Sequence, residues 1–415
     1  MSTTDHSLTR HPSRWRSILP TLVLMWVVGQ IDKGNFGFVV AYHPFLTQMD
    51  LLHHPPLIGL LATSFLIAYG VGMPLWGFLV DRWGPRRSAI LGLGLWLLMM
   101  VLGGSAPSLP ILFVSRIILG LSEGVLWPAC NAMTSRWFPV DEQNRASAWW
   151  INGINIGLGI AGIVTTALLV LIGWRGCFFV VAAFTLVPLT MLWFVHDDPL
   201  PKAETAIATT NLEARKAKNI ERPLWTQSPL ANYRLWLITI ANTATGMGIW
   251  GVMAWIPKYL VDVRHFSMGN MGIDLSGIWF ICIAVLAGVG AWADRQGRRA
   301  PFGAAAFLMY GISITLSAIM PNSGLAILFI AIAIWTLQVT TVMVFSMIHG
   351  LSSGRSVGVS TGVLAGVSNL VASLAPFVMG ILIAATHSYI GAFSFLGGAA
   401  LIGSGMMAIL IPQGY

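Results

Sequence analysis

The stretch Gly77-Phe-Leu-Val-Asp81-Arg82-Trp-Gly84-Pro-Arg86-Arg87 recurs as Gly290-Ala-Trp-Ala-Asp294-Arg295-Gln-Gly297-Arg298-Arg299. Gly, Asp, Arg and Gly stand at the same internal spacing in both copies, and each copy follows an apolar run in the same place in its half of the chain. One copy alone would pass for an ordinary basic turn. Two copies in register predict two helical bundles related by an axis along the membrane normal, with a binding site between them near the midplane.

The composition places the chain in a membrane. Only 9% of its 415 residues are charged and 56% are hydrophobic, whereas a soluble domain carries about 25% charged residues. In a soluble protein the formal charge of +8 would suggest nucleic acid as a partner. Here it fits basic cytoplasmic loops, so we expect no nucleic-acid partner. The three cysteines lie in apolar runs, which argues against a disulfide or metal framework.

The apolar stretches are long enough for an all-helical membrane protein with twelve spans. We expect these spans at 17–42, 57–80, 88–104, 109–133, 146–172, 176–195, 234–257, 272–292, 302–320, 324–348, 357–384 and 389–411. The longest polar segment then divides the chain into an N-terminal six-helix bundle (1–195), a cytoplasmic central loop (196–233) and a C-terminal six-helix bundle (234–415).

The basic residues set the orientation. With both termini in the cytoplasm, eighteen Lys and Arg residues fall inside and three fall outside. This bias satisfies the positive-inside rule. We therefore expect a multi-pass protein of the cell's inner (cytoplasmic) membrane, in contact with lipid and working as a monomer.

Four charged residues remain near the middle of spans, all in the N-terminal half: Asp32, Lys33, Arg116 and Glu123. Each charge at the bilayer centre costs about 2.5–3.5 kcal/mol on insertion scales. Buried ion pairs are weak stabilisers, so a purely structural cluster is the less favoured reading. We expect Lys33 and Arg116 to attract an anion while Asp32 or Glu123 accepts a proton, because desolvation favours the protonated carboxylate and a nearby cation favours the ionised one.

The repeated stretch, the six-plus-six spans and the central loop resemble the major facilitator superfamily. The resemblance covers the whole chain and implies that the two loops help to hold one end of an alternating-access cycle. It assigns this gating role to Gly77, Asp81, Arg82, Gly84, Asp294, Arg295 and Gly297.

A narrower resemblance is carried by Ile31-Asp32-Lys33-Gly34-Asn35 in the first span and by Arg116, Gly120, Glu123 and Pro128 around the fourth. These residues resemble the anion:cation symporter family, relatives of the vesicular glutamate and sialic-acid carriers. The resemblance implies substrate-binding residues at Lys33, Tyr69, Arg116, Asn155 and Asn369, and proton-linked carboxylates at Asp32 and Glu123. Lys33 stands where the family usually has Arg, which removes a planar bidentate donor.

The resulting expectation is proton-coupled uptake of a small organic anion, such as a sugar acid or another hydroxy-carboxylate. Two alternatives stay open: a proton-antiport exporter on the same fold, and a membrane sensor that does not transport. We expect no enzyme, because no nucleophile triad or zinc spacing is apparent. With no nucleotide-binding loop either, we expect no cofactor and no bound metal, only the proton as coupling ion. Trp250 and Trp255 are candidates for the cavity wall.

Overall fold

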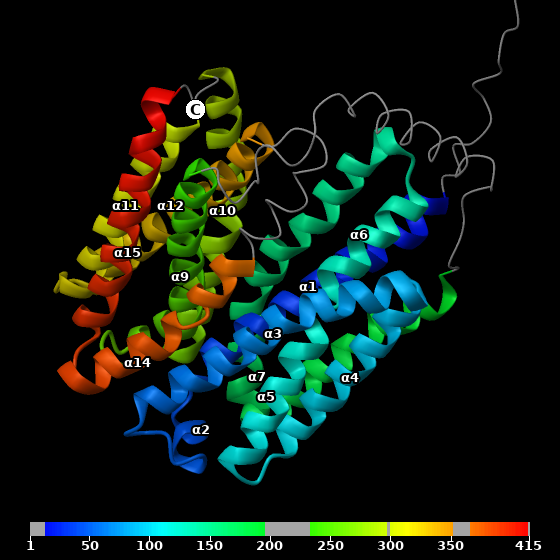
Figure 1. Ribbon diagram of the computed structural model, residues 1–415. Coiled ribbons are helices and arrows are strands. Elements are labelled where there is room, and N and C mark those ends of the chain that lie inside the picture. The colour runs from blue at the N-terminus through cyan, green and yellow to red at the C-terminus, as the bar shows by residue number, and fades with distance from the viewer. Residues whose placement is uncertain (1–12, 196–232, 297–298, 352–365, 414–415) are drawn as a thin grey trace, which may run out of the picture.

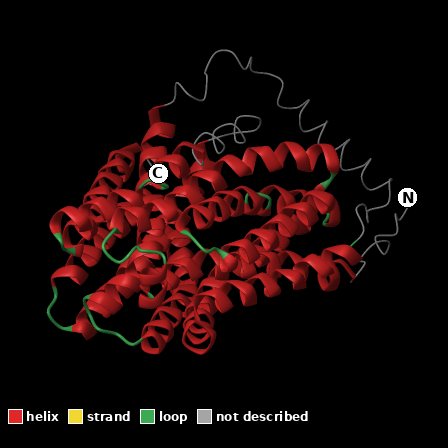
Figure 2. Cartoon of the chain, turned by 90° about the horizontal axis from the view of Figure 1, so that it is seen from below, coloured by secondary structure: helices red, strands yellow, loops and turns green. Residues whose placement is uncertain are grey.

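The computed structural model describes residues 13–195, 233–296, 299–351 and 366–413. Every regular element in this described part of the chain is helical, as Figure 2 shows. The expected central loop, apart from Tyr233, lies outside the described residues, as do positions 357–365 of the eleventh expected span.

The N-terminal half begins with one long helix and a short one, and ends with α7, in which two helices follow one another across a kink. Its elements are α1 (Ser13–Ala41), α2 (His43–Gln48), α3 (Pro55–Trp83), α4 (Pro85–Ser105), α5 (Leu109–Glu123), α6 (Leu126–Trp137) and α7 (Val140–Phe194). The C-terminal half contains α9 (Tyr233–Asp262), α10 (Met268–Gln296), α11 (Ala300–Ile319), α12 (Ser323–Leu351), α14 (Ala375–Thr386), α15 (Tyr389–Leu410) and a closing 3₁₀ turn (Ile411–Gln413).

Among the described residues, ten helical stretches are long and apolar enough to cross a membrane. One of them, Glu142–Phe194, has 53 residues, and about 20 suffice for one crossing. When the two helices within this stretch are counted separately and α1 is added, the helices correspond to the twelve expected spans. Large apolar side chains also face outward: Leu171 is 77% exposed and Phe194 is 80% exposed. Such a surface suits lipid rather than water, so the chain is a multi-pass membrane protein.

One expected span contains an interruption that the sequence pattern did not predict. In the fourth span the regular helical hydrogen bonding lapses at Gly124 and Val125, between α5 and α6, although both residues keep right-handed helical φ and ψ. This interruption falls directly after Glu123, and it therefore lies beside one of the four intramembrane charges. The α7 segment consists of two helices that meet across a kink at Gly173, where φ is 71°, in agreement with the expected end of the fifth span and start of the sixth.

The two halves meet through three pairs of helices, α1 with α9, α3 with α14, and α7 with α10 (Figure 1). The backbones approach closely there: a Cβ built on Gly37 would lie 2.1 Å from the carbonyl oxygen of Met253, and one on Gly59 would lie 2.3 Å from that of Pro376. Thr63 also donates a 2.7 Å hydrogen bond to the Ser373 carbonyl. In the orientation expected from the basic residues, these contacts lie toward the outer ends of the helices.

Candidate substrate and proton site

All four intramembrane charges are buried together in the N-terminal half. Asp32 and Lys33 come from α1, and Arg116 and Glu123 come from α5. Each of the four residues is between 0% and 7% exposed. Because Asp32 and Lys33 are adjacent on a helix, their side chains point in directions about 100° apart, and the two contact different neighbours.

Lys33 and Glu123 form a buried ion pair between α1 and α5. The Lys33 ammonium also lies 4.9 Å from the centre of the Tyr69 ring on α3, a cation–π distance. The second carboxylate oxygen of Glu123, Oε1, is buried and has no hydrogen-bond partner among the described residues. An unsatisfied oxygen at this depth is costly and gives a proton a place to bind.

Arg116 is held by aromatic rings rather than by a carboxylate. The centre of its guanidinium lies 4.4 Å from the Phe36 ring and 4.5 Å from the Phe65 ring. Its Nε is buried without a partner, and within the described part of the chain the guanidinium makes no hydrogen bond or ion pair. Stacking orients a guanidinium without using its N–H donors, so these donors stay available for an anion.

Asp32 lies beside Glu123 and also reaches α4. Trp96, which is fully buried, donates a 2.8 Å hydrogen bond from its indole nitrogen to Asp32 Oδ2. The other oxygen, Oδ1, is buried and has no partner among the described residues. Asp32 and Glu123 therefore each have one satisfied oxygen and one free oxygen.

A cavity opens beside the two cations at the junction of the halves. It contains about 330 Å³ of empty space, part of it open to solvent. Helices α1, α3 and α5 supply one side, and α9 supplies the other. The lining residues are Lys33, Phe36, Gly37, Ala62, Phe65, Leu66, Arg116, Trp250, Met253 and Ala254.

The expected binding residues fall into two groups. Lys33 and Arg116 line the cavity, and Tyr69 lies against Lys33. Asn155 on α7 and Asn369 before α14 are half-buried, but neither lines this cavity. Of the two candidate wall residues, Trp250 lines it, whereas Trp255 is fully buried and donates a hydrogen bond to the Pro376 carbonyl.

Sequence reasoning missed four contributors: Phe36, Phe65, Trp96 and Met253. Apolar side chains inside apolar spans give no signal of their own. One clue was available, because an intramembrane Arg or Asp needs a neighbour that can stack on it or donate to it.

The first copy of the repeated loop forms the turn between α3 and α4. Gly84 ends α3 with φ at 87°, a conformation that suits glycine. Asp81 and Arg82 are exposed, and no Cβ contact would arise within 4 Å of Gly77. Arg86 ties the turn to the end of α7 by donating to the carbonyls of Leu192 and Trp193.

The second copy is described only in part. Asp294 and Arg295 lie in the last turn of α10, and Gly297 lies outside the described residues. Arg299, at the position that matches Arg86, donates a 3.0 Å hydrogen bond to the Ser346 carbonyl on α12. Both copies thus place an Arg against the backbone of another helix in its own half.

Comparisons with known proteins agree with this architecture. Residues 22–333 match the family model of the Major Facilitator Superfamily. A probable sulfoacetate transporter of Cupriavidus necator is 26% identical over 97% of this chain and 93% of its own length. A hexuronate transporter of Bacillus subtilis is 23% identical over 93% of each chain.

Solved structures give the same fold. The crystal structure of a D-xylose–proton symporter aligns with a TM-score of 0.79 at 15% sequence identity, covering 96% of this chain and 98% of that one. The two sequence relatives, from Cupriavidus necator and Bacillus subtilis, are described as transporters, which agrees with the expectation that this chain is not an enzyme. The matched model spans most of the chain, so this protein belongs to the Major Facilitator Superfamily of membrane transporters.

Proposed function

We propose that this protein couples the uptake of a small organic anion to the entry of protons. One observation carries the proposal: Arg116, a buried guanidinium that makes no direct ion pair or hydrogen bond among the described residues, lies at a cavity between the two halves and beside the Lys33–Glu123 ion pair. A buried cation with free donors is a costly arrangement unless a ligand completes it.

Charge neutrality supports the coupling to protons. Asp32, Lys33, Arg116 and Glu123 sum to zero, and a bound anion would leave one net negative charge in a poorly solvated site. A proton on the free oxygen of Glu123 or Asp32 removes that charge. The anion and Glu123 also compete for the same cation, Lys33. When Lys33 turns from Glu123 to the anion, the Glu123 carboxylate loses its counter-ion, and this loss favours its protonation. We therefore propose one proton for each negative charge carried.

The cycle follows from the cavity's position between the halves. The anion and the proton enter from outside, the halves rock about the site, and both leave to the cytoplasm. The relatives described as sulfoacetate and hexuronate transporters support an anionic substrate, and they place carboxylates and sulfonates first among the anions to be tested. We place this monomeric carrier in the cytoplasmic membrane.

Uptake into proteoliposomes with an acidic exterior tests the proposal. A panel of labelled carboxylates and sulfonates should contain at least one that accumulates when the pH gradient is imposed, and accumulation should stop when a protonophore collapses the gradient. If no anion in the panel enters under any gradient, the proposal is wrong. Export driven by inward proton flow would instead support the antiport alternative.

A further inference from the structure

The cavity beside Arg116 combines two cationic side chains with a wall of side chains that contain no oxygen atom. Apart from Lys33 and Arg116, its eight lining residues carry no hydroxyl, amide or carboxylate side chain, and the indole of Trp250 supplies the one remaining polar hydrogen. The two Phe rings that stack on Arg116 form part of this wall. Charge recognition is therefore confined to one end of the cavity.

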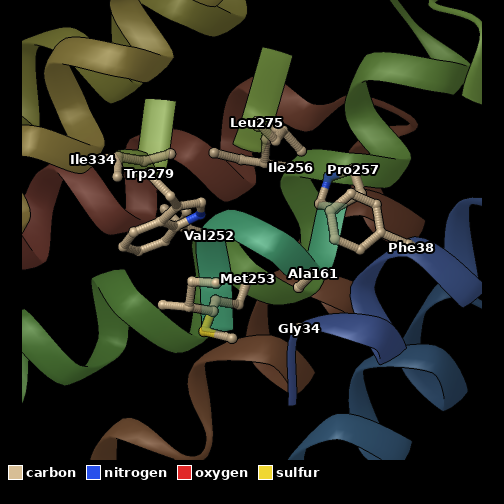
Figure 3. Close-up of a pocket in the computed structure, with 11 residues that line it drawn as sticks. Gly34, Phe38, Ala161, Val252, Met253, Ile256, Pro257, Leu275, Trp279 and Ile334 are labelled. Atoms are coloured by element: carbon tan, nitrogen blue, oxygen red, sulfur yellow. The ribbon is translucent and has the colours of Figure 1, made fainter. Parts of the chain in front are cut away.

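A second cavity continues this surface on the other side of Met253. Its lining comes from α1, α7, α9, α10 and α12, and Met253 lines both cavities. Figure 3 shows Trp279 and Phe38 to the two sides, with Met253 between them. None of the eleven lining residues carries a charge, a hydroxyl or an amide side chain. It contains about 390 Å³ of empty space, part of it open to solvent.

These walls are poorly suited to a polyhydroxylated substrate. A hydroxyl removed from water needs a hydrogen-bond partner, and the amides expected to supply one, Asn155 and Asn369, line neither cavity. A hydrocarbon ring or branched chain has no such need and gains from leaving water. Aromatic rings and a flexible Met side chain are typical walls for an apolar ligand.

Resting on the proposed function, we infer that the substrate is an organic anion with an apolar body, its acid group held by Arg116 and Lys33 and its ring or branched chain against Met253. This class excludes the hydroxyl-rich sugar acids, although relatives carry such names. Gly34 and Gly37 on α1 border the two cavities, so the anion would lie along α1 across the junction of the halves.

A matched pair of ring acids tests the inference with the unmodified protein. Cyclohexanecarboxylate and glucuronate each carry one carboxylate on a saturated six-membered ring, and they differ chiefly in the hydroxyls. Calorimetric titration of the purified protein should show binding of cyclohexanecarboxylate at least about tenfold tighter. Equal or tighter binding of glucuronate would overturn the inference and leave anion transport standing. Binding of neither acid would also overturn it, and the pH-gradient uptake panel would judge the proposed function separately.

A substitution at Met253 tests whether the apolar wall causes the preference for cyclohexanecarboxylate. Met253→Gln keeps the length of the side chain and adds an amide, so the preference for cyclohexanecarboxylate over glucuronate should fall by about tenfold. The control, Met343→Gln, makes the same change at a buried residue of α12 that packs in a separate apolar cluster, and the ratio should not change. An unchanged ratio in Met253→Gln, with the protein shown to be folded by its thermal transition, would contradict the placement.

Discussion

Arg116 is the residue whose environment departs most from an ordinary buried charge. Its two faces are covered by Phe36 and Phe65, while its N–H edge has no partner in the described part of the chain. Stacking fixes the plane of the guanidinium and so prepares a bidentate donor for a carboxylate or sulfonate. A lysine cannot reproduce that fork.

We predict that Arg116→Ala reduces anion binding by at least about 100-fold, because hydrogen bonds to charged groups contribute about 1.5–3 kcal/mol each. Arg116→Lys should recover part of the affinity, since it keeps the charge and loses the second donor. Equilibrium binding of a transported anion to the purified variants measures both effects. Unchanged affinity in Arg116→Ala would remove this residue from the site.

Lys33 provides a prediction about stability. Lys33→Met leaves the Glu123 carboxylate buried with no cation bonded to it, and breaking such a pair costs about 3–5 kcal/mol. Adding Glu123→Gln should recover most of the loss. Thermal unfolding of the two variants in detergent checks the prediction.

Lys258→Met is the matched control for this prediction. Lys258 pairs with Asp262 at 2.9 Å, but the Asp262 side chain is 37% exposed and also accepts a hydrogen bond from Tyr389. A partly exposed pair contributes about 0–1 kcal/mol, so this variant should unfold close to the wild-type temperature. If Lys258→Met lowered the unfolding temperature as much as Lys33→Met does, burial would not be what makes the Lys33–Glu123 pair important for stability.

At the scale of elements, the break between α5 and α6 and the contacts between halves matter most. Glu123 is the last residue of α5, and the chain turns at Gly124 before α6 begins. The intramembrane carboxylate is therefore placed at a helix end. The Lys33–Glu123 pair joins α1 to α5, while the Trp96–Asp32 hydrogen bond joins α1 to α4.

Closure of the outer side depends on the absence of side chains at the points where helices cross. Gly59 on α3 faces the Pro376 carbonyl, and an added Cβ would lie 2.3 Å from it. We predict that Gly59→Leu holds the outer ends apart. Transport should stop, and a cysteine introduced at Ala254 should react faster with a membrane-impermeant thiol reagent added from outside.

Gly70→Leu, on the same helix, is the control, because no atom lies within 4 Å of the position of its Cβ. It should transport normally and leave the labelling rate unchanged. If Gly59→Leu and Gly70→Leu behave alike, the crossing of α3 and α14 does not close the outer side.

At the scale of the whole molecule, the sequence predicted the architecture well and the cavity only in part. The repeat around Asp81 and Asp294 indicated two related halves, and the apolar stretches indicated the spans, because hydrocarbon imposes strong requirements on length and backbone bonding. The interruption at Gly124 was not predicted, since glycine is common in membrane helices whether or not they bend. The boundary between the fifth and sixth spans was predicted, and it coincides with the kink at Gly173.

The same contrast applies to the site. Charged residues in hydrocarbon are conspicuous, so all four were found from the sequence. Met253, Phe36 and Phe65 were not found, because the selectivity of an apolar wall depends on which apolar residues face the cavity, and that follows from helix rotation and packing. The roles expected for the substrate-binding, proton-linked and loop residues all stay predictions, including those of Asn155, Asn369 and both loop copies.

The two halves differ in chemistry despite their common plan. The four intramembrane charges belong to the N-terminal half, while the C-terminal half contributes Trp250, Met253 and Ala254 to the cavity. In the proposed cycle, charge exchange and coupling thus belong to the N-terminal bundle, whereas both bundles supply the apolar lining of the cavity.

The central claim is that anion and proton meet at the four-charge cluster, and proton movement measured during anion uptake tests it most directly. Proteoliposomes containing a pH-sensitive dye should acidify inside when a transported anion is added outside. Glu123→Gln should still exchange labelled anion across the membrane but should not acidify the interior, whereas Glu142→Gln, at the cytoplasmic end of α7, should acidify it like the wild type. Anion uptake by the wild-type protein without acidification would contradict proton coupling, and so would full acidification by both Glu123→Gln and Asp32→Asn.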